Sequence, residues 1–155
     1  MSVAFRREGD DEHLEPKFEL PLPSGPNLVT VRGLAQIQDK ITELESVLAK
    51  LEGETEIAAT RRDLRYWHTR LSTAEPMNAP DGKRVAFGTT VGIRLNGRDN
   101  TITIVGHDEA DPAAGLLSFS APLCRAMMGA EVGDILDFSG KPDVLEILTI
   151  QITTL

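Results

Sequence analysis

Residues 106–134 decide the fold, and they read GHDEADPAAGLLSFSAPLCRAMMGAEVGD. The stretch opens with an acidic turn, in which Pro112 fixes its own φ and moves Asp111 away from the helical region. A short apolar strand is expected at residues 116–119. A helix of small residues should follow at residues 122–128, because proline at the first helical position has no N–H group to leave unbonded. The pattern therefore predicts a small mixed domain with a rigid acidic loop at its surface.

Alternating apolar residues predict further strands on both sides of this stretch. Asn96-Gly97 is a strong signal for a tight turn between two antiparallel strands. A linker is expected at residues 78–83, which contain a proline and a glycine. Residues 79–155 are therefore predicted to form an α+β domain, an antiparallel sheet with one short helix. The expected strands are residues 84–95, 101–105, 116–119, 135–138 and 144–152.

Two helices with heptad spacing are predicted before the linker. Thr30 is the expected N-cap of the first helix, Gly53 separates the two, and Thr55 is the expected cap of the second. In each helix the apolar positions are alternately three and four residues apart, and each seam needs the other for burial. Residues 30–78 are therefore predicted to form an antiparallel coiled-coil hairpin. The seam positions are Leu34, Ile37, Ile41, Leu44, Leu48 and Leu51, then Ile57, Thr60, Leu64, Trp67, Leu71 and Ala74.

Residues 1–29 have the composition of a flexible tail. They contain four of the nine prolines, and six acidic residues against three basic ones. Such a segment cannot bury enough apolar surface to offset the entropy of ordering it. The alternative is that Phe18, Leu20 and Leu22 dock as an extended strip on another surface.

Charge and cysteine content restrict the functional classes. The net charge is −8, and direct binding to DNA is disfavoured because duplex affinity depends on basic side chains that neutralise phosphates. Cys124 is the single cysteine and is predicted to be a buried structural thiol in a reducing compartment. No apolar run approaches the roughly 20 residues of a membrane span, and no signal peptide is apparent. A cytoplasmic protein without membrane contact is expected.

Several short sequence motifs resemble motifs in the C-terminal domain of the bacterial transcript cleavage factors GreA and GreB. They occur in the order that the family has, and they cover residues 85 to 150. The chain departs from the family at Ala121-Pro122, where the family usually has Ser-Pro. Two further motifs resemble the boundaries of the family's coiled coil: Val29-Thr30-x-x-Gly33 and Leu71-Ser72-x-Ala74. The motifs in the C-terminal domain are Val85-x-Phe87-Gly88-x-x-Val91, Ile104-Val105-Gly106-x-Asp108-Glu109-Ala110-Asp111, Leu117-Ser118, Pro122-Leu123 and Val132-Gly133-Asp134.

The resemblance implies a fold and a partner. The C-terminal domain of the family resembles the FKBP prolyl isomerases and binds RNA polymerase. The coiled coil enters the secondary channel of the polymerase, where an acidic pair at its tip helps to hold a catalytic Mg²⁺ ion. The expected polymerase-binding residues of this chain are Asp108, Glu109, Asp111, Pro112, Ser120, Pro122 and Leu123.

The predicted tip differs from that of the family. The family's tip motif, which resembles Asp-Leu-Ser-Glu-Asn, is absent. The hairpin is also several helical turns shorter than that of the family, and its arms reach only about 30 Å. The tip has Glu52, Glu54 and Glu56 instead. They are either a substitute for the acidic pair or a solvated loop, with Glu54 and Glu56 favourable at the positive end of the second helix.

Basic residues of the second helix also leave two interpretations open. They form a face for an acidic polymerase or RNA surface, or they are ordinary solvated residues paired along the helix. These residues are Arg61, Arg62, Arg65 and Arg70.

The sequence thus predicts a Gre-family elongation regulator that binds RNA polymerase near the secondary channel and stimulates cleavage weakly or not at all. It is expected to be an accessory factor without an active site or cofactor of its own, since no metal-binding or nucleophile motif is present; any Mg²⁺ would be shared with the polymerase. One alternative is a short-armed antagonist similar to the regulator of nucleoside diphosphate kinase. Another is an FKBP-like prolyl isomerase or chaperone.

Overall fold

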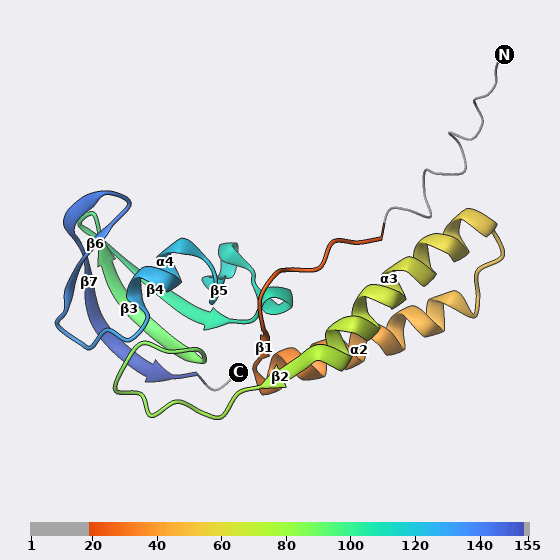
Figure 1. The fold of residues 1–155 in the computed structure, drawn as a ribbon, viewed down its shortest axis with the longest axis horizontal. Helices are drawn as coiled ribbons and strands as arrows, with labels where there is room; N and C mark the ends of the chain where they lie inside the picture. Colours follow the sequence, from red (N-terminus) through yellow and green to blue (C-terminus); the bar gives the residue numbers. More distant parts are fainter. Residues whose placement is uncertain (1–18, 154–155) are drawn as a thin grey trace, which may run out of the picture.

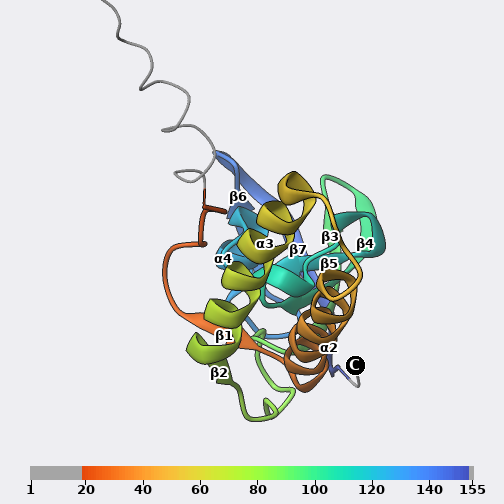
Figure 2. The same ribbon diagram turned by 90° about the vertical axis from the view of Figure 1, so that its right-hand side faces the viewer.

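The computed structural model describes residues 19–153 and has mixed α and β architecture. Two long helices form a hairpin that projects from one end of a small sheet (Figure 1). Figure 2 looks along the molecule from the hairpin side and shows the two helices in front of the sheet. The predicted flexibility of residues 1–18, and the predicted docking of Phe18, lie outside the described residues.

The hairpin consists of α2 (Val31–Leu48) and α3 (Glu54–Thr73). The Thr30 hydroxyl accepts a hydrogen bond from the Gly33 N–H at 2.9 Å, which confirms the predicted N-cap. The predicted cap at Thr55 is wrong: Gly53 is the N-cap of α3, and Thr55 lies within the first turn. The apolar seam joins the helices. Its buried residues are Ile37, Ile41, Leu44 and Leu64 with Val29, and Leu34, Leu48, Trp67, Leu71 and Ala74 pack around them.

A two-stranded parallel sheet closes the base of the hairpin. It pairs β1 (Asn27–Val29) with β2 (Ala74–Pro76). The predicted tail extended to residue 29, and this boundary is wrong because the last three residues form β1. Val29 is buried against the helices, and Asn27 donates from Nδ2 to the carbonyl oxygen of Arg70 at 2.8 Å.

The larger sheet has five strands in the order β5-β4-β3-β7-β6. The prediction that all pairs are antiparallel is wrong for one of them, since β5 runs parallel to β4. The strand predicted at residues 84–95 begins only at Thr89. Residues 84–88 turn instead, because the Val85 N–H bonds to the carbonyl oxygen of Ala130 and Gly88 has a φ of +87°. The strands are β3 (Thr89–Leu95), β4 (Arg98–Val105), β5 (Leu116–Ser118), β6 (Ile135–Phe138) and β7 (Lys141–Ile152).

The predicted turn at Asn96-Gly97 is confirmed. Both residues have positive φ, 51° and 83°, as a two-residue hairpin turn between right-twisted strands requires. The predicted short helix is α4 (Pro122–Met127), with the proline in its first turn. Cys124 and Met127 bury its inner face against the sheet. Cys124 is fully buried, as predicted, and burial raises the pKa of its thiol to about 11.

The acidic turn between β4 and β5 forms two single-turn 3₁₀ helices, η3 (His107–Glu109) and η4 (Pro112–Ala114). They carry the chain from the core of the sheet to the base of the hairpin, where η3 contacts both β1 and α2. In the described part of the chain, no helix has the length and apolar character needed to cross a membrane.

Candidate functional site

The first half of the acidic loop faces the hairpin and not the solvent. The side chain of Asp108 is only 11% exposed, and that of Glu109 only 2%. The expectation that the whole loop lies at the surface is therefore wrong for these two residues. Both carboxylates are used within the chain, at the junction between the hairpin and the sheet.

Asp108 receives two hydrogen bonds from α3. Arg70 donates from Nε to Oδ2 at 2.6 Å, and the Tyr66 hydroxyl donates to Oδ1. The Arg70 guanidinium also donates from Nη2 to Oδ1 of Asn27 at 2.7 Å. A buried charge pair needs such additional partners, because desolvation of both ions offsets their attraction. Loop, strand β1 and helix α3 thus meet at one buried arginine.

Glu109 is bound at the first turn of α2. The Thr30 hydroxyl donates to Oε1 at 2.5 Å while it caps the helix, and Arg32 Nη1 lies 3.4 Å from Oε2. A carboxylate at this position is favoured by the positive end of the helix dipole. Each of the two hairpin helices is thereby tied to one acidic residue of η3.

Two glycines make this close approach possible. A Cβ atom on Gly106 would lie 2.3 Å from the carbonyl oxygen of Leu28, which is backbone and cannot move aside. A Cβ atom on Gly33 would lie 2.8 Å from Oε1 of Glu109. Both glycines belong to the motifs that resemble those of the family. At the junction, the lack of a side chain at each glycine lets the neighbouring segment pack closely.

Burial at the junction changes two pKa values. Burial, together with the hydrogen bond to Asp108, raises the pKa of Tyr66 to about 12. Burial, with the nearby positive charge of Arg70, lowers the pKa of His107. His107 Nδ1 lies 3.0 Å from the Ser118 hydroxyl, and among the described residues its buried Nε2 has no hydrogen-bond partner. A neutral imidazole fits this position.

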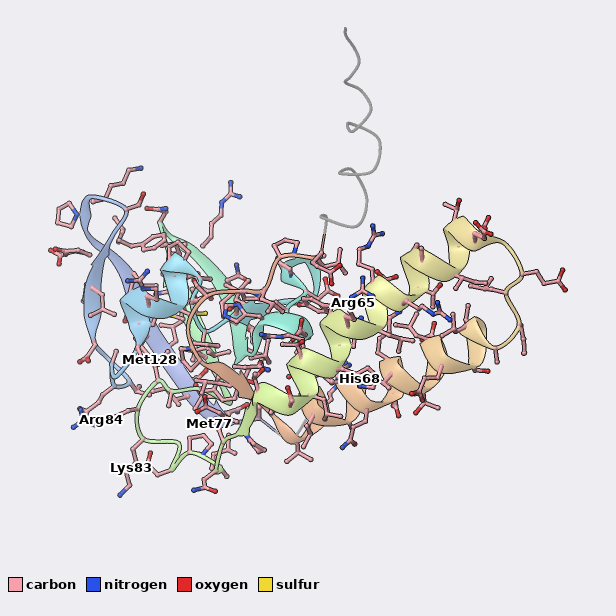
Figure 3. The ribbon with its side chains drawn as sticks, turned by 45° about the vertical axis from the view of Figure 1, so that its right-hand side comes forward. Arg65, His68, Met77, Lys83, Arg84 and Met128 are labelled. Atoms are coloured by element: carbon pink, nitrogen blue, oxygen red, sulfur yellow. The ribbon has the colours of Figure 1, made fainter. Side chains whose placement is uncertain are left out.

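The rest of the predicted surface is open to solvent. Four of its residues, Asp111, Pro112, Ser120 and Pro122, are exposed, and Leu123 is partly buried. Sequence reasoning missed three exposed apolar side chains that follow α4: Met128, Val132 and Ile135, which are 42%, 58% and 57% exposed. Figure 3 shows Met128 on the side of the sheet remote from the hairpin tip.

The three glutamates of the tip are all exposed. Glu56 folds back over the N-terminus of α3, so that a Cβ atom on Gly53 would lie only 2.1 Å from its Oε1. Among residues 19–153, no three metal-binding side chains converge, so Glu52 and Glu54 do not form such a group with Glu56. The geometry favours the solvated-loop interpretation, with carboxylates at the positive end of α3.

The four arginines of α3 do not form one face. Arg70 is only 3% exposed and belongs to the junction, so its prediction as a surface residue is wrong. Arg61 and Arg65 are exposed, and Arg62 is partly buried. Figure 3 shows Arg65 on α3 above His68, pointing towards the segment that precedes β1.

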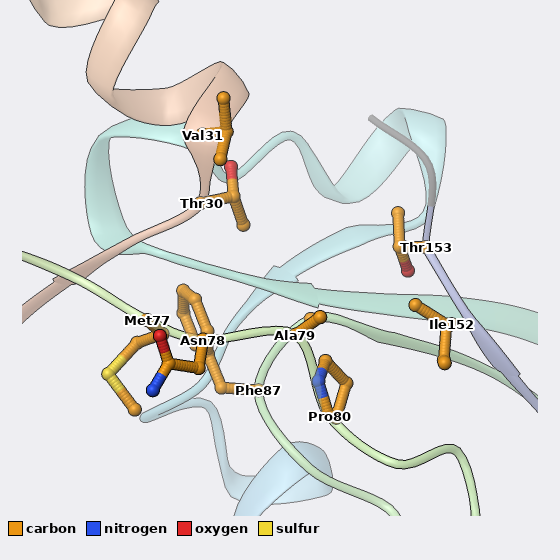
Figure 4. A pocket seen from close by; sticks show the side chains of 10 residues that line it. Thr30, Val31, Met77, Asn78, Ala79, Pro80, Phe87, Ile152 and Thr153 are labelled. Atoms are coloured by element: carbon orange, nitrogen blue, oxygen red, sulfur yellow. The ribbon is translucent and has the colours of Figure 1, made fainter.

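A small pocket of about 120 Å³ lies beside the junction, between the linker, the start of α2 and the end of β7. Figure 4 shows Phe87 and Pro80 on its walls, with Ile152 at one side. Among the described lining residues, Phe87 is the sole aromatic one. Proline isomerisation requires an aromatic-lined apolar pocket, and this one offers a single ring.

A family profile and curated relatives indicate one family. A family profile described as "Transcription elongation factor, GreA/GreB, C-term" matches residues 79–152. The transcription elongation factor GreA of Pseudomonas putida is 32% identical over 136 residues, which is 86% of this chain and 82% of that protein. GreB of Neisseria meningitidis is 34% identical over 107 residues, 65% of this chain and 66% of that protein. The solved GreA/GreB structure from Nitrosomonas europaea, 18% identical, covers 83% of this chain and 99% of that one, with a TM-score of 0.39.

Proposed function

The chain belongs to the GreA/GreB family of transcription elongation factors, and we propose that it binds bacterial RNA polymerase near the secondary channel while stimulating little or no transcript cleavage. In this proposal residues 79–155 are the FKBP-like docking domain. Residues 30–78 are the family's coiled coil in a shortened form. The segment before β1 takes no part in binding the polymerase.

The docking surface that we propose is the exposed half of the acidic loop together with the start of α4. It contains Asp111, Pro112, Ser120, Pro122 and Leu123. In this proposal Asp108 and Glu109 position the hairpin and do not contact the polymerase. Their carboxylates are already bonded to Arg70 of α3 and to Thr30, the N-cap of α2.

One observation carries the proposal, namely the buried junction between η3 and the hairpin. Each helix is tied to a separate carboxylate, so the hairpin is held at two points and cannot pivot about one bond. A protein that docks through residues 111–123 would therefore set the direction of the hairpin. This is the property that an elongation factor needs if its helices are to enter a channel of the polymerase.

The low cleavage activity that we propose follows from the length and chemistry of the hairpin. Its helices have 18 and 20 residues, which correspond to about 27 and 30 Å at a rise of 1.5 Å per residue. A carboxylate binds Mg²⁺ directly only at about 2.0–2.1 Å, so a tip that falls short by one turn supplies no ligand. The same length favours the short-armed antagonist as a second candidate, in which the chain occupies the site and displaces a true cleavage factor.

The binding test is retention of purified core RNA polymerase on the immobilised full-length chain. Pro122→Asp should weaken retention, because it adds a charge to the proposed surface at the first position of α4, where an acidic residue is compatible with a helix. Val31→Asp is the matched control, at the first position of α2 and 78% exposed. Equal retention by both variants would place the docking surface elsewhere. Added GreA then tests the second candidate, because an antagonist should lower the transcript cleavage that GreA stimulates.

A further inference from the structure

The described part of the chain begins with an ion pair to α3. The Arg65 guanidinium donates from Nε and from Nη2 to the two carboxylate oxygens of Glu19, each at 2.7 Å. Two parallel bonds of this kind fix direction as well as distance. In Figure 1 the segment after Glu19 runs from the side of α3 down to β1. Glu19 is therefore held at the exposed face of α3 that carries Arg65.

That face contains a hollow, and the described residues that line it all belong to α3. Three of them are arginines, two are alanines, one is a glutamate and one is a threonine. In the described part of the chain, the buried Nε of Arg62 has no hydrogen-bond partner. A buried donor without an acceptor costs free energy, so the hollow is suited to an acidic occupant. The lining residues are Glu54, Thr55, Ala58, Ala59, Arg61, Arg62 and Arg65.

The sequence before Glu19 provides such an occupant. Residues 8–15 read EGDDEHLE, with five acidic residues and no lysine or arginine. An extended chain advances about 3.3 Å per residue, so Glu15 can lie up to about 13 Å from Glu19 and Asp11 up to about 26 Å. The hollow from Arg65 to Glu54 extends about 16 Å along the helix at 1.5 Å per residue. Length and charge both match.

We propose that the acidic segment of residues 8–15 docks in the α3 hollow and covers Arg61 and Arg62, continuing the contact between Glu19 and Arg65. The three arginines of the hollow are then occupied by the chain itself, and an acidic partner must displace the segment to reach them. Pairs of this exposure are individually weak and screened by salt. The docking is therefore reversible, and high salt releases the segment.

The test uses amide NMR spectra of the full chain. In the variant Glu8→Gln, Asp10→Asn, Asp11→Asn, Glu12→Gln, Glu15→Gln, we expect shifts of the amide signals of residues 54–65 and unchanged signals in β3 and β4. Raising the salt concentration of the native chain to about 1 M, where the screening length is about 3 Å, should move the same signals in the same direction. Changes confined to residues 1–18 would overturn the proposal.

A reciprocal variant tests the other partner. Arg61→Gln with Arg62→Gln should shift the signals of residues 8–15 and remove their salt dependence, while glutamine preserves helix propensity. The matched control is Arg98→Gln with Arg125→Gln, which removes two exposed arginines of the C-terminal sheet and α4. If both pairs shift residues 8–15 equally, or if neither does, the segment does not occupy the hollow.

Discussion

Arg70 of α3 and Asp108 of the β4–β5 loop form a buried ion pair across the junction, with Nε 2.6 Å from Oδ2. Their side chains are 4% and 11% exposed. The pair joins residues 38 positions apart in the sequence, and it connects the hairpin to the C-terminal domain, which contains most of the family's motifs.

We expect Arg70→Met to lower the free energy of unfolding by about 3–5 kcal/mol. Removal of one partner leaves the Asp108 carboxylate buried with the Tyr66 hydroxyl as its remaining side-chain donor, and Asn27 also loses a partner. Urea unfolding followed by circular dichroism measures the change. Arg94→Met is the control, because Arg94 makes the same Nε contact with Asp99 at 2.8 Å but both side chains are exposed. Similar losses for the two variants would contradict a structural role for the junction.

Tyr66 should ionise unusually late. Burial and the bond to Asp108 raise its pKa from 10.0 to about 12, and it is the single tyrosine of the chain. Tyrosinate absorbance therefore reports this residue alone. We expect a midpoint near pH 12 in the folded protein and near pH 10 in urea. A folded-state midpoint near 10 would show that the hydroxyl is free.

The same shift makes stability depend on pH. Because the folded pKa is raised, the contribution of Tyr66 to stability is fully present below pH 10 and is lost as the pH rises through about 12. Tyr66→Phe should remove this component, so that the unfolding midpoints of variant and native chain converge in alkali. Parallel curves between pH 9 and 12 would exclude the linkage.

Gly106→Ala should destabilise the protein by at least about 1–3 kcal/mol, since the added Cβ would meet the Leu28 carbonyl oxygen at 2.3 Å. β1 would have to move away from η3. Gly33→Ala is the comparison, because its Cβ would meet a side-chain oxygen of Glu109 within a helix that favours alanine. We expect a smaller loss there, measured by thermal unfolding. The reverse order would mean that β1 and η3 are not in firm contact.

The tip should be dispensable for any residual transcript cleavage. An arrested elongation complex with Mg²⁺ is assayed for release of short 3′ RNA fragments, with the native chain and with Glu52→Gln, Glu54→Gln, Glu56→Gln. We expect little release and no difference, because the glutamates are exposed and Glu56 folds back on its own helix. A cleavage factor with full-length arms is the positive control. Strong release that the triple substitution abolishes would mean that this loop reaches the active centre.

The sequence was sufficient wherever structure depends on local rules. The helix cap at Thr30, the hairpin turn at Asn96-Gly97 and the start of α4 at Pro122 follow from backbone chemistry within a few residues. The heptad spacing likewise identified the helix faces that pack together, because periodicity records burial. The family's motifs could also be found in the sequence, because each is a short run of residues in a set order.

Tertiary structure alone decided the role of the acidic loop. Asp108 and Glu109 belong to an acidic run that is expected to be solvated, and their burial depends on donors from Tyr66, Arg70 and Thr30. Those donors lie between 38 and 79 residues away in the sequence. The strand at residues 27–29 was missed similarly, because it pairs with β2 across the whole hairpin. A charge is stable inside a protein only when its partner is there, and the spacing of residues along the chain does not show which distant partner arrives.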